Sequence, residues 1–353
     1  MKCKFGEIAT GFDYGMNAAA KPYDGQNKYI RITDIDEASS TYNNSSIVSP
    51  DGILSENYVV NEGDILLART GASTGKSYLY RKSDGKLYYA GFLIRANVAE
   101  HNPYFVFSQL HTHRYWRWVS IMSARSGQPG INSLEYASFP IFTTTLKEEN
   151  KISSLLSLID ERITTQNKII EKLQSLIKGI AQNIVLRNKP NVRISQCLEC
   201  CSSTLQESDV LEYGTYPVYG ANGVVGFLDN YNTSNEAIYI IKDGSGVGAV
   251  SYVAGKCSAT GTLNILQAKK GFSLRYLYYL LNIFNFEPYK TGMAIPHIYF
   301  KDYGKAQIFC PSYSEQLKYA KFLATIDDKL LTEQNVLINL SLQKQYLLRQ
   351  MFI

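Results

Sequence analysis

Two stretches of the chain repeat apolar residues at alternating intervals of four and three positions. The first has one polar member, Gln166, among its ten seam positions: Ile152, Leu156, Ile159, Ile163, Gln166, Ile170, Leu173, Ile177, Ile180 and Ile184. The second is more polar but has the same spacing: Tyr319, Leu323, Ile326, Leu330, Glu333, Leu337, Leu340, Lys344, Leu347 and Met351. Such a seam, sustained for more than four heptads, is typical of a coiled coil. The pattern therefore predicts two long helices, at 146–187 and 312–353, that pack on each other.

The starts and midpoints of the two predicted helices also match. Thr145 with Glu148, and Ser312 with Glu315, have the spacing of a capping box, in which a hydroxyl and a carboxylate satisfy free backbone N–H groups. A polar residue at a seam position usually fixes register or partner. At about 1.5 Å per residue, about 40 residues make a rod of ~60 Å, which predicts a spacer. The alternative is two amphipathic helices that pack on unrelated domains.

A globular segment with strand-like patterns precedes each predicted helix. Residues 1–145 contain the runs KYIRITDI, GDILLAR, SYLYR and AGFLIRANV, and residues 188–311 contain YPVYGANGVVGFLDNY, AIYIIKDG, GAVSYV and GTLNIL. LRYLYYLLNIF, which follows the second set, has a helical pattern. The sequence predicts an α+β protein with two mixed α/β domains, each followed by a long helix.

The two halves of the chain are copies of one plan. Residues 129–173 align with 296–340 without a gap, at a constant offset of 167 (296 − 129 = 167). Identical pairs include Pro129/Pro296, Ile131/Ile298, Tyr136/Tyr303, Glu148/Glu315 and Lys151/Lys318. An internal repeat with a pseudo-two-fold arrangement follows from this duplication.

Composition and charge narrow the function classes only a little. The 353 residues have 36 Lys+Arg against 31 Asp+Glu, a net charge of +5, which permits a polyanionic partner. Neither a signal peptide nor a run of ~20 apolar residues is present, so we expect a cytoplasmic protein without a membrane segment. The six cysteines include a single CxxC in CLECC, which is a weak metal signal. We expect reduced thiols and no metal.

Residues 68–77, ARTGASTGKS, end in the Gly-Lys-Ser of a phosphate-binding P-loop. A Walker A motif needs four residues between its glycines and a helix after them, whereas this stretch has three and is followed by a strand pattern. The aligned stretch IKDGSGVGAV replaces Lys76 with Ala249 and Ser77 with Val250. The pattern favours a glycine turn between two strands with a polar tip, and a nucleotide hydrolase is the weaker interpretation.

No catalytic constellation emerges from the remaining residues. HNPYF at 101–105 lacks the second proline of the Asn-Pro-Pro-Tyr signature of adenine methyltransferases, and no glycine-rich cofactor loop accompanies it. The four histidines have no metal-ligand spacing. We therefore expect a chain without catalytic residues, metal or cofactor.

The chain resembles a specificity subunit of a type I restriction-modification system over nearly its whole length. The resemblance rests on the globule–helix–globule–helix order and on the helix entries SGQPGINSLEYASFPIF and TGMAIPHIYFKDYGKAQIF. GDILLARTGASTGK and YGTYPVYGANGVVGF are also typical of target recognition domains. The resemblance implies recognition domain 1 at 1–145, a central spacer helix at 146–187, recognition domain 2 at 188–311 and a C-terminal spacer helix at 312–353.

The resemblance also implies partners. Each domain would bind one half of a split target in double-stranded DNA, and the helices would pair antiparallel and set the gap between the halves. Two modification subunits, which bind S-adenosylmethionine and methylate adenine, would dock on the helices, and restriction subunits would join that complex. The chain itself would be non-catalytic.

We expect the DNA-contacting residues on turn tips and on the loops before the closing strands, where polar side chains suit phosphates and base edges. In the first domain these candidates are Arg69, Thr70, Ser73, Thr74, Lys76, Arg125, Ser126 and Gln128. In the second they are Tyr219, Asn222, Lys242, Asp243, Ser245, Lys290, Thr291 and His297.

One alternative of a different class stays open at this point. The chain would then be a non-catalytic coiled-coil adaptor whose globular domains bind protein through the tyrosine-rich loops; the sequence has 27 tyrosines. DNA binding with a steep salt dependence would favour the specificity subunit over the adaptor.

Overall fold

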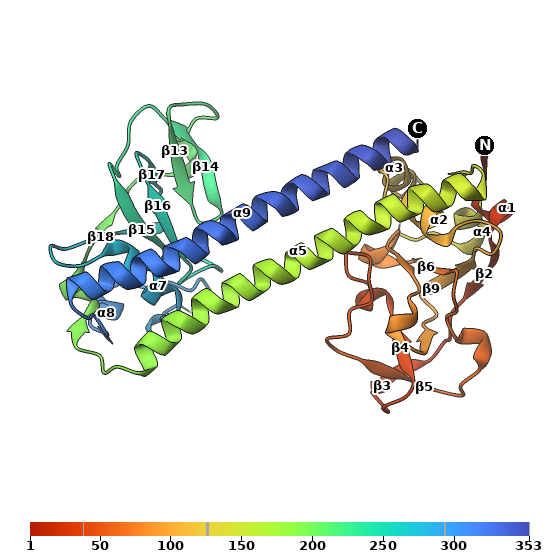
Figure 1. Cartoon of the computed structure of the whole chain (residues 1–353), viewed down its shortest axis with the longest axis horizontal. Helices are drawn as coiled ribbons and strands as arrows, with labels where there is room; N and C mark the ends of the chain where they lie inside the picture. The colour runs from red at the N-terminus through yellow and green to blue at the C-terminus, as the bar shows by residue number, and fades with distance from the viewer. Residues whose placement is uncertain (38, 125–126, 293, 353) are drawn as a thin grey trace. The chain divides into compact units, whose positions relative to one another are not determined.

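A computed structural model describes residues 1–37, 39–124, 127–292 and 294–352 of the chain. The fold is α+β and divides into two compact units (Figure 1). The first unit comprises Met1–Thr165 with Leu337–Ile353, and the second comprises Gln166–Val336. Each unit contains a segment of both long helices, α5 (Leu146–Leu186) and α9 (Tyr313–Met351).

The first unit is built on a four-stranded antiparallel sheet. Its order is β2 (Thr10–Tyr14), β9 (Leu93–Asn97), β6 (Asp64–Ala68) and β7 (Ser77–Leu79). Every residue of β6 is buried, and one core cluster joins this strand to α2 (Pro103–Gln109) and α3 (His113–Met122). Two smaller antiparallel pairs join β1 (Lys2–Lys4) with β10 (Pro140–Phe142) and β3 (Ala19–Pro22) with β5 (Val48–Asp51). A parallel pair joins β4 (Lys28–Ile30) with β8 (Leu87–Tyr89). The short helices are α1 (Phe5–Ile8) and α4 (Ser133–Ala137).

The second unit has a sheet of the same kind. Its order is β12 (Leu198–Ser202), β18 (Leu263–Ala268), β15 (Glu236–Ile241) and β16 (Val250–Ala254). Helix α7 (Leu274–Asn282), predicted from its sequence pattern, packs on β15 and β16. A second, three-stranded sheet has the order β14 (Gly223–Leu228), β13 (Tyr216–Gly220) and β17 (Ser258–Ala259). Strand β11 (Val192–Arg193) pairs with β19 (Gln307–Ile308). The short helices are α6 (Ile194–Cys197) and α8 (Phe300–Tyr303).

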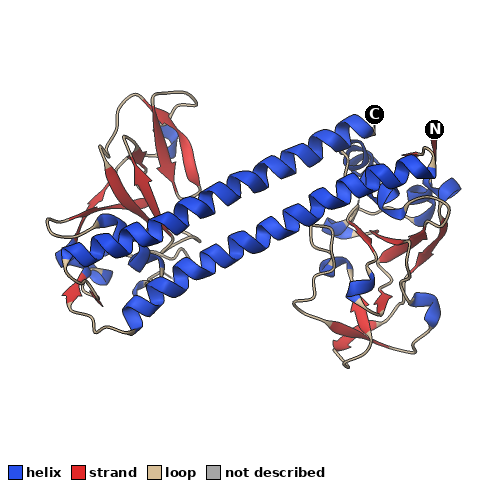
Figure 2. Cartoon of the chain, in the orientation of Figure 1, coloured by secondary structure: helices blue, strands red, loops and turns tan. Residues whose placement is uncertain are grey.

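The duplication predicted from the sequence is confirmed in the topology. In both units a strand near the start of the unit lies at one edge of the sheet, the last strand of that sheet in sequence lies next to it, and a strand–turn–strand completes the sheet. Each unit also has a short antiparallel pair, β1 with β10 and β11 with β19, whose later strand precedes the long helix. Figure 2 shows that each unit combines strands with short helices.

The long helices begin where the capping residues predict, although each start has only half of the expected box. At α5 the hydroxyl of Thr145 accepts a hydrogen bond from the Glu148 N–H at 3.4 Å. At α9 the carboxylate of Glu315 accepts from the Ser312 N–H at 3.2 Å. The Ser312 hydroxyl also donates to this carboxylate at 2.6 Å, and the bonds from the Ser312 hydroxyl and N–H hold the pKa of Glu315 below its usual range.

The predicted seams are confirmed within each unit, since every seam residue is buried or half-buried. In the first unit Lys344 pairs with Asp160 at 2.6 Å, and Leu156 shares a core cluster with Leu348. In the second unit the amide of Gln166 donates to the Glu333 carbonyl at 3.0 Å. Residue numbers that rise on α5 meet numbers that fall on α9, so the segments run antiparallel in each unit. None of the helices in the described residues is long and apolar enough to cross a membrane.

Candidate nucleic-acid interface

The glycine-rich stretch at 69–76 forms a tight turn between β6 and β7. Residues Gly71–Ser73 make one turn of 3-10 helix, and the Gly75 N–H donates to the Ala68 carbonyl at 3.0 Å. Gly75 has a φ of +92°, a conformation that a residue with a Cβ rarely adopts. A strand follows the turn, so the P-loop interpretation is wrong. The ammonium of Lys76 is 3.0 Å from the Glu37 carboxylate.

Main-chain hydrogen bonds fasten this turn to the loop that precedes α4. The Gly71 N–H donates to the Pro129 carbonyl at 2.9 Å, and the Ile131 N–H donates to the Arg69 carbonyl at 2.9 Å. The hydroxyl of Thr74, which is buried, donates to the Gly71 carbonyl at 2.8 Å. The structure therefore brings Arg69, Thr70 and Ser73 together with Gln128. The candidates Arg125 and Ser126 lie outside the described residues.

Two buried tyrosines form hydrogen bonds with the backbone of this turn. The hydroxyl of Tyr136 donates to the Ala68 carbonyl at 2.6 Å and accepts from the Gly75 N–H at 3.2 Å. The hydroxyl of Tyr115 donates to the Gly75 carbonyl at 2.8 Å. Burial raises the pKa of both phenols, so both remain neutral donors. Sequence reasoning did not select these residues, although the identity of Tyr136 and Tyr303 in the repeat was a signal.

The second unit repeats the same main-chain bonds around a different tip. The Gly248 N–H donates to the Ile241 carbonyl at 2.9 Å, the Gly244 N–H to Pro296 at 3.0 Å, and the Ile298 N–H to Lys242 at 2.9 Å. Asp243 and Ser245 at this tip are exposed. The candidate side chains of the turn are thus Arg69, Thr70 and Ser73 in one copy and Lys242, Asp243 and Ser245 in the other.

The loop beside the second tip contains three more candidates. Thr291 and His297 exchange main-chain hydrogen bonds of 2.9 and 2.8 Å. The His297 ring packs edge-on against Tyr299 at 5.0 Å, and the ammonium of Lys290 is 2.6 Å from the Glu287 carboxylate. Lys290 thus already forms an ion pair with a neighbouring carboxylate.

The hairpin β13–β14 supplies the last two candidates, which differ in exposure. Asn222 is exposed at the tip, next to Gly223 with a φ of +101°. The ring of Tyr219 packs against Tyr239 at 5.8 Å, and burial raises the pKa of Tyr219. The loop that contains Thr260 and Thr262 links this hairpin to the turn at 242–248. The Thr260 N–H donates to the Tyr219 carbonyl at 2.9 Å, and the Thr262 carbonyl accepts from the Lys242 N–H at 3.0 Å.

A groove of about 680 Å³ lies next to the turn of the first unit. Its polar and aromatic lining includes Tyr14, Arg31, Thr33, Arg69 and Phe92. The guanidinium carbon of Arg69 is 4.7 Å from the Tyr14 ring centroid, which is a cation–π geometry. Phe92 is 58% exposed. Sequence reasoning missed Tyr14 because no strand was predicted at β2, the element that places Tyr14 at the groove. It also missed Arg31 and Phe92, which lie in runs predicted as strands, because the sequence does not reveal which loops line a groove.

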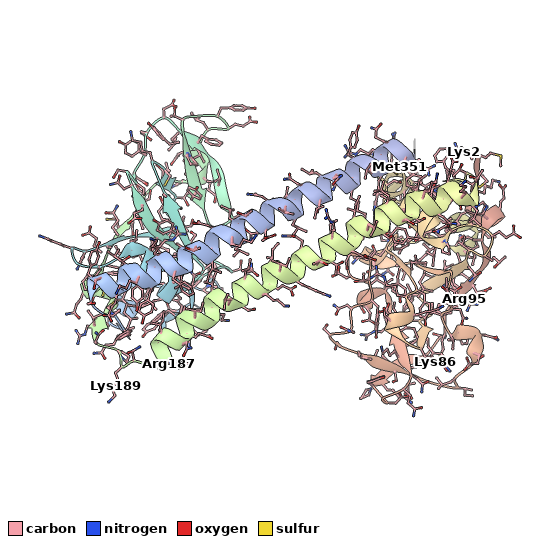
Figure 3. All side chains as sticks on the ribbon, in the orientation of Figure 1. Lys2, Lys86, Arg95, Arg187, Lys189 and Met351 are labelled. Carbon is pink, nitrogen blue, oxygen red and sulfur yellow. The ribbon has the colours of Figure 1, made fainter. Side chains whose placement is uncertain are left out.

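Three other basic side chains of the first unit are paired with carboxylates. Lys86 and Arg95, labelled in Figure 3, extend from the strand-rich part of this unit. Lys86 is 2.7 Å from Glu56, and Arg95 is 3.4 Å from Asp13. Arg31 in the groove bonds to Asp34 at 2.7 Å. Lys86 and Arg95 also lie over aromatic rings, those of Tyr88 and Tyr89, at 5.2 Å. Within the described residues, Arg69 differs from these cations in forming no ion pair with a carboxylate.

The chemistry available to these surfaces is binding. Across 1–37, 39–124, 127–292 and 294–352, no three His, Cys, Asp or Glu side chains gather closely enough to hold a metal ion. Polar tips that are fixed by main-chain bonds and flanked by aromatic rings suit contacts to phosphates and base edges.

A family model describes part of this architecture. The model for the type I restriction modification DNA specificity domain matches residues 191–340. The matched stretch includes the turn at 242–248 and the residues Thr291 and His297, and it continues into α9.

Three curated relatives with similar sequences are type I specificity subunits. A type I restriction enzyme specificity subunit of Haemophilus influenzae is 26% identical over 113 residues, 31% of this chain and 29% of that protein. The Escherichia coli EcoprrI specificity subunit is 25% identical over 126 residues, 36% and 30% of the two chains. A Mycoplasma genitalium type I specificity subunit is 24% identical over 245 residues, 63% of each chain. The matched stretches thus span less than two thirds of these relatives.

Solved structures extend the likeness of fold to the whole chain. The crystal structure of a type I restriction-modification S subunit from M. genitalium matches with a TM-score of 0.70 at 18% identity, covering 100% of this chain and 96% of that one. A chain from a study of complex assembly and conformational transition of the type I R-M system matches with a TM-score of 0.54 at 14% identity, covering 99% and 96%. The α+β fold with two long helices is therefore that of the specificity subunits.

Proposed function

We propose that this chain is the DNA-binding specificity subunit of a type I restriction-modification complex. Each globular domain, at 1–145 and 188–311, binds one half of a split target. The observation that carries this proposal is the duplicated turn. Matching main-chain bonds hold it in both units, while the side chains at the tip differ, with the half-buried Arg69 in one copy and the half-buried Lys242 beside the exposed Asp243 in the other. Two rigid platforms with different polar tips suit the recognition of two different half-sites.

The long helices are proposed to set the gap between the half-sites. Helix α5 has 41 residues and α9 has 39, so each measures ~60 Å at about 1.5 Å per residue. A helical turn of DNA is ~34 Å. Helices of this length suit a spacer between two DNA-binding domains that contact the same face of a duplex.

Two modification subunits are proposed to dock on the helices, and restriction subunits to join through them. Apolar side chains outside the seam support a protein partner: in the first unit Leu158 and Leu342 are 58% and 57% exposed, and in the second Phe322 and Leu331 are 56% and 58% exposed. Exposed apolar patches of this kind mark interaction sites. In this assembly the chain supplies sequence recognition, and the chemistry belongs to its partners.

Adenine methylation across the genome tests the proposed function. Cells that encode this chain are compared with cells from which the gene has been deleted. We expect a bipartite motif, with two short specified halves and an unspecified gap, to lose its methylation in the deletion strain and to regain it on complementation. Methylation that does not depend on the gene would refute the proposal.

Binding measurements separate this function from that of a protein adaptor. The chain, alone and with modification subunits, is titrated with duplex DNA over a range of salt concentrations. We expect the logarithm of the association constant to fall linearly with the logarithm of the salt concentration, because Lys and Arg displace counterions from the phosphates. Indifference to DNA at every salt concentration would favour the adaptor.

A further inference from the structure

Arg69 is held in one place by its main chain. Its N–H donates to the Phe92 carbonyl at 3.0 Å, and its carbonyl accepts from the Ile131 N–H at 2.9 Å. The residue is half-buried and lines the groove beside the turn. Because both main-chain groups are engaged, the side chain leaves the turn from a fixed point and in a fixed direction.

The ring of Tyr14 lies under the guanidinium and is itself fixed. The guanidinium carbon of Arg69 is 4.7 Å from the ring centroid. The Tyr14 phenol oxygen accepts a hydrogen bond from the backbone N–H of Ser133, the first residue of α4, at 3.3 Å. Hydrogen bonding to Ser133, chiefly to its side chain, lowers the pKa of Tyr14, and the charge of Arg69 acts in the same direction. The ring remains 42% exposed, so the cation–π pair lies at the surface.

The guanidinium of Arg69 keeps its hydrogen-bond donors available. Within the described parts of the chain, no carboxylate forms an ion pair with it, whereas Arg31 is bonded to Asp34 at 2.7 Å and Arg95 faces Asp13 at 3.4 Å. A guanidinium stacked on an aromatic face has its plane set by the ring, and its edge then presents a fork of N–H donors. Such a fork fits two acceptors side by side.

We propose that Tyr14 is a positioning residue that holds the Arg69 guanidinium to contact a guanine in the half-site bound by the first unit. This inference rests on the proposed function. Guanine presents O6 and N7 together in the major groove, and bidentate arginine is their commonest partner. The fork can also bind two oxygens of a phosphate, but a phosphate contact carries no sequence information, so the two contacts differ in their effect on the motif. The corresponding residue of the second unit is Lys242, a point charge without a fork, so the second unit lacks this contact at its turn.

The test replaces the chromosomal gene by variants and maps adenine methylation across the genome. Arg69→Lys keeps the charge and removes the fork. We expect one G·C position in one half of the motif to become degenerate, with discrimination against other base pairs falling about tenfold to hundredfold, while the other half is unchanged. Lys242→Ala is the matched control, and it should affect only the other half.

Variants of Tyr14 separate positioning from folding. Tyr14→Leu removes the stacking face and should loosen the same G·C position as Arg69→Lys. Tyr14→Phe keeps the ring and should retain the wild-type motif. If Tyr14→Leu does not accumulate as folded protein, Arg69→Lys and Tyr14→Phe still decide the question.

Three results would overturn the inference. Arg69→Lys could leave the motif unchanged, the loosened position could lack a G·C pair, or methylation could weaken equally at all sites, which is the behaviour of a phosphate contact. In each case a gene-dependent bipartite motif would still support the proposed function. The absence of any gene-dependent motif in the wild type would overturn both.

Discussion

Replacing Glu149 by alanine is expected to destabilise the first unit more than any change at an exposed turn tip. Glu149 lies in the first turn of α5, and its side chain is fully buried. Its carboxylate accepts hydrogen bonds from the backbone N–H groups of Asn102 at 2.9 Å and Thr144 at 3.3 Å, and it contacts His101 Nδ1 at 2.8 Å. Asn102 is the N-cap of α2, so one side chain joins two helix starts.

The magnitude follows from the donors that Glu149→Ala leaves without an acceptor. Two part-buried N–H groups at about 1–3 kcal/mol each give a loss of about 2–6 kcal/mol, against a total stability of about 5–15 kcal/mol for a typical domain. Asn102 and Thr144 bond to different carboxylate oxygens, so Glu149→Gln keeps one acceptor and should cost about 1–3 kcal/mol.

The duplication supplies an internal comparison for this prediction. Gln316 occupies the equivalent position of α9 (316 − 149 = 167) and accepts from the N–H of Ser273, the N-cap of α7, at 2.9 Å. Gln316→Ala leaves one N–H without an acceptor, so we expect a loss of about 1–3 kcal/mol, confined to the second unit.

Urea unfolding of the full chain measures the loss in free energy of unfolding for each variant. Hydrogen exchange, measured in peptides from each unit, shows which unit is destabilised. Protection should fall in α2 and the sheet of the first unit for Glu149→Ala, and in α7 for Gln316→Ala. The reasoning is refuted if Glu149→Ala stays within 0.5 kcal/mol of wild type, a bound set by typical surface substitutions at about ±0.5 kcal/mol, or if Glu149→Gln is equally destabilising.

Three further predictions concern a histidine, the seam and the glycine turn. Burial, with a contribution from Lys344, lowers the pKa of His111 to about 4, so the unfolded chain binds a proton first as the pH falls below about 6.5. Stability should fall by about 3 kcal/mol between pH 6.5 and pH 4 from this group, and the difference between wild type and His111→Asn in urea titrations measures it. Replacing Gln166 and Glu333 together by leucine makes this level of the seam apolar on both helices, so the melting temperature should rise, while the register becomes less strictly defined; a lower melting temperature would contradict this. Lys76→Ala should leave every ATP-dependent step of the assembled complex unchanged, because Lys76 pairs with Glu37 at 3.0 Å.

The long helices and the duplication could be predicted from the sequence because their signals are periodic. The seam from Ile152 to Ile184 depends only on a spacing that every helix of this kind repeats, and the 167-residue offset depends only on identities such as Tyr136 with Tyr303. Neither signal requires knowledge of which loops meet.

The groove and the helix-start contacts could not be predicted because they depend on long-range packing. Tyr14 meets Arg69 only because β2 and β6 both pair with β9. Glu149 and Gln316 perform the same task with different residue types, so the repeat alignment did not mark them. Tyr219, selected as an exposed recognition residue, packs against Tyr239 because β13 places its ring on the core side of the hairpin.

In each turn the backbone bonds are the same and the side chains at the tip differ. This difference explains how one duplicated fold can recognise two sequences. The bonds that fasten the turn to its neighbouring loop join backbone atoms, such as Gly71 N–H to Pro129 and Gly244 N–H to Pro296, and they do not depend on the side chains at the tip. The tip can therefore change from Arg69 and Thr70 to Lys242 and Asp243 without loss of the support below it. Recognition then varies at little cost in stability, since surface substitutions usually change stability by only about 0.5 kcal/mol. In a chain of this design, exchanging tip residues should change the target, whereas changing the glycines, Tyr136 or Glu149 should change the fold.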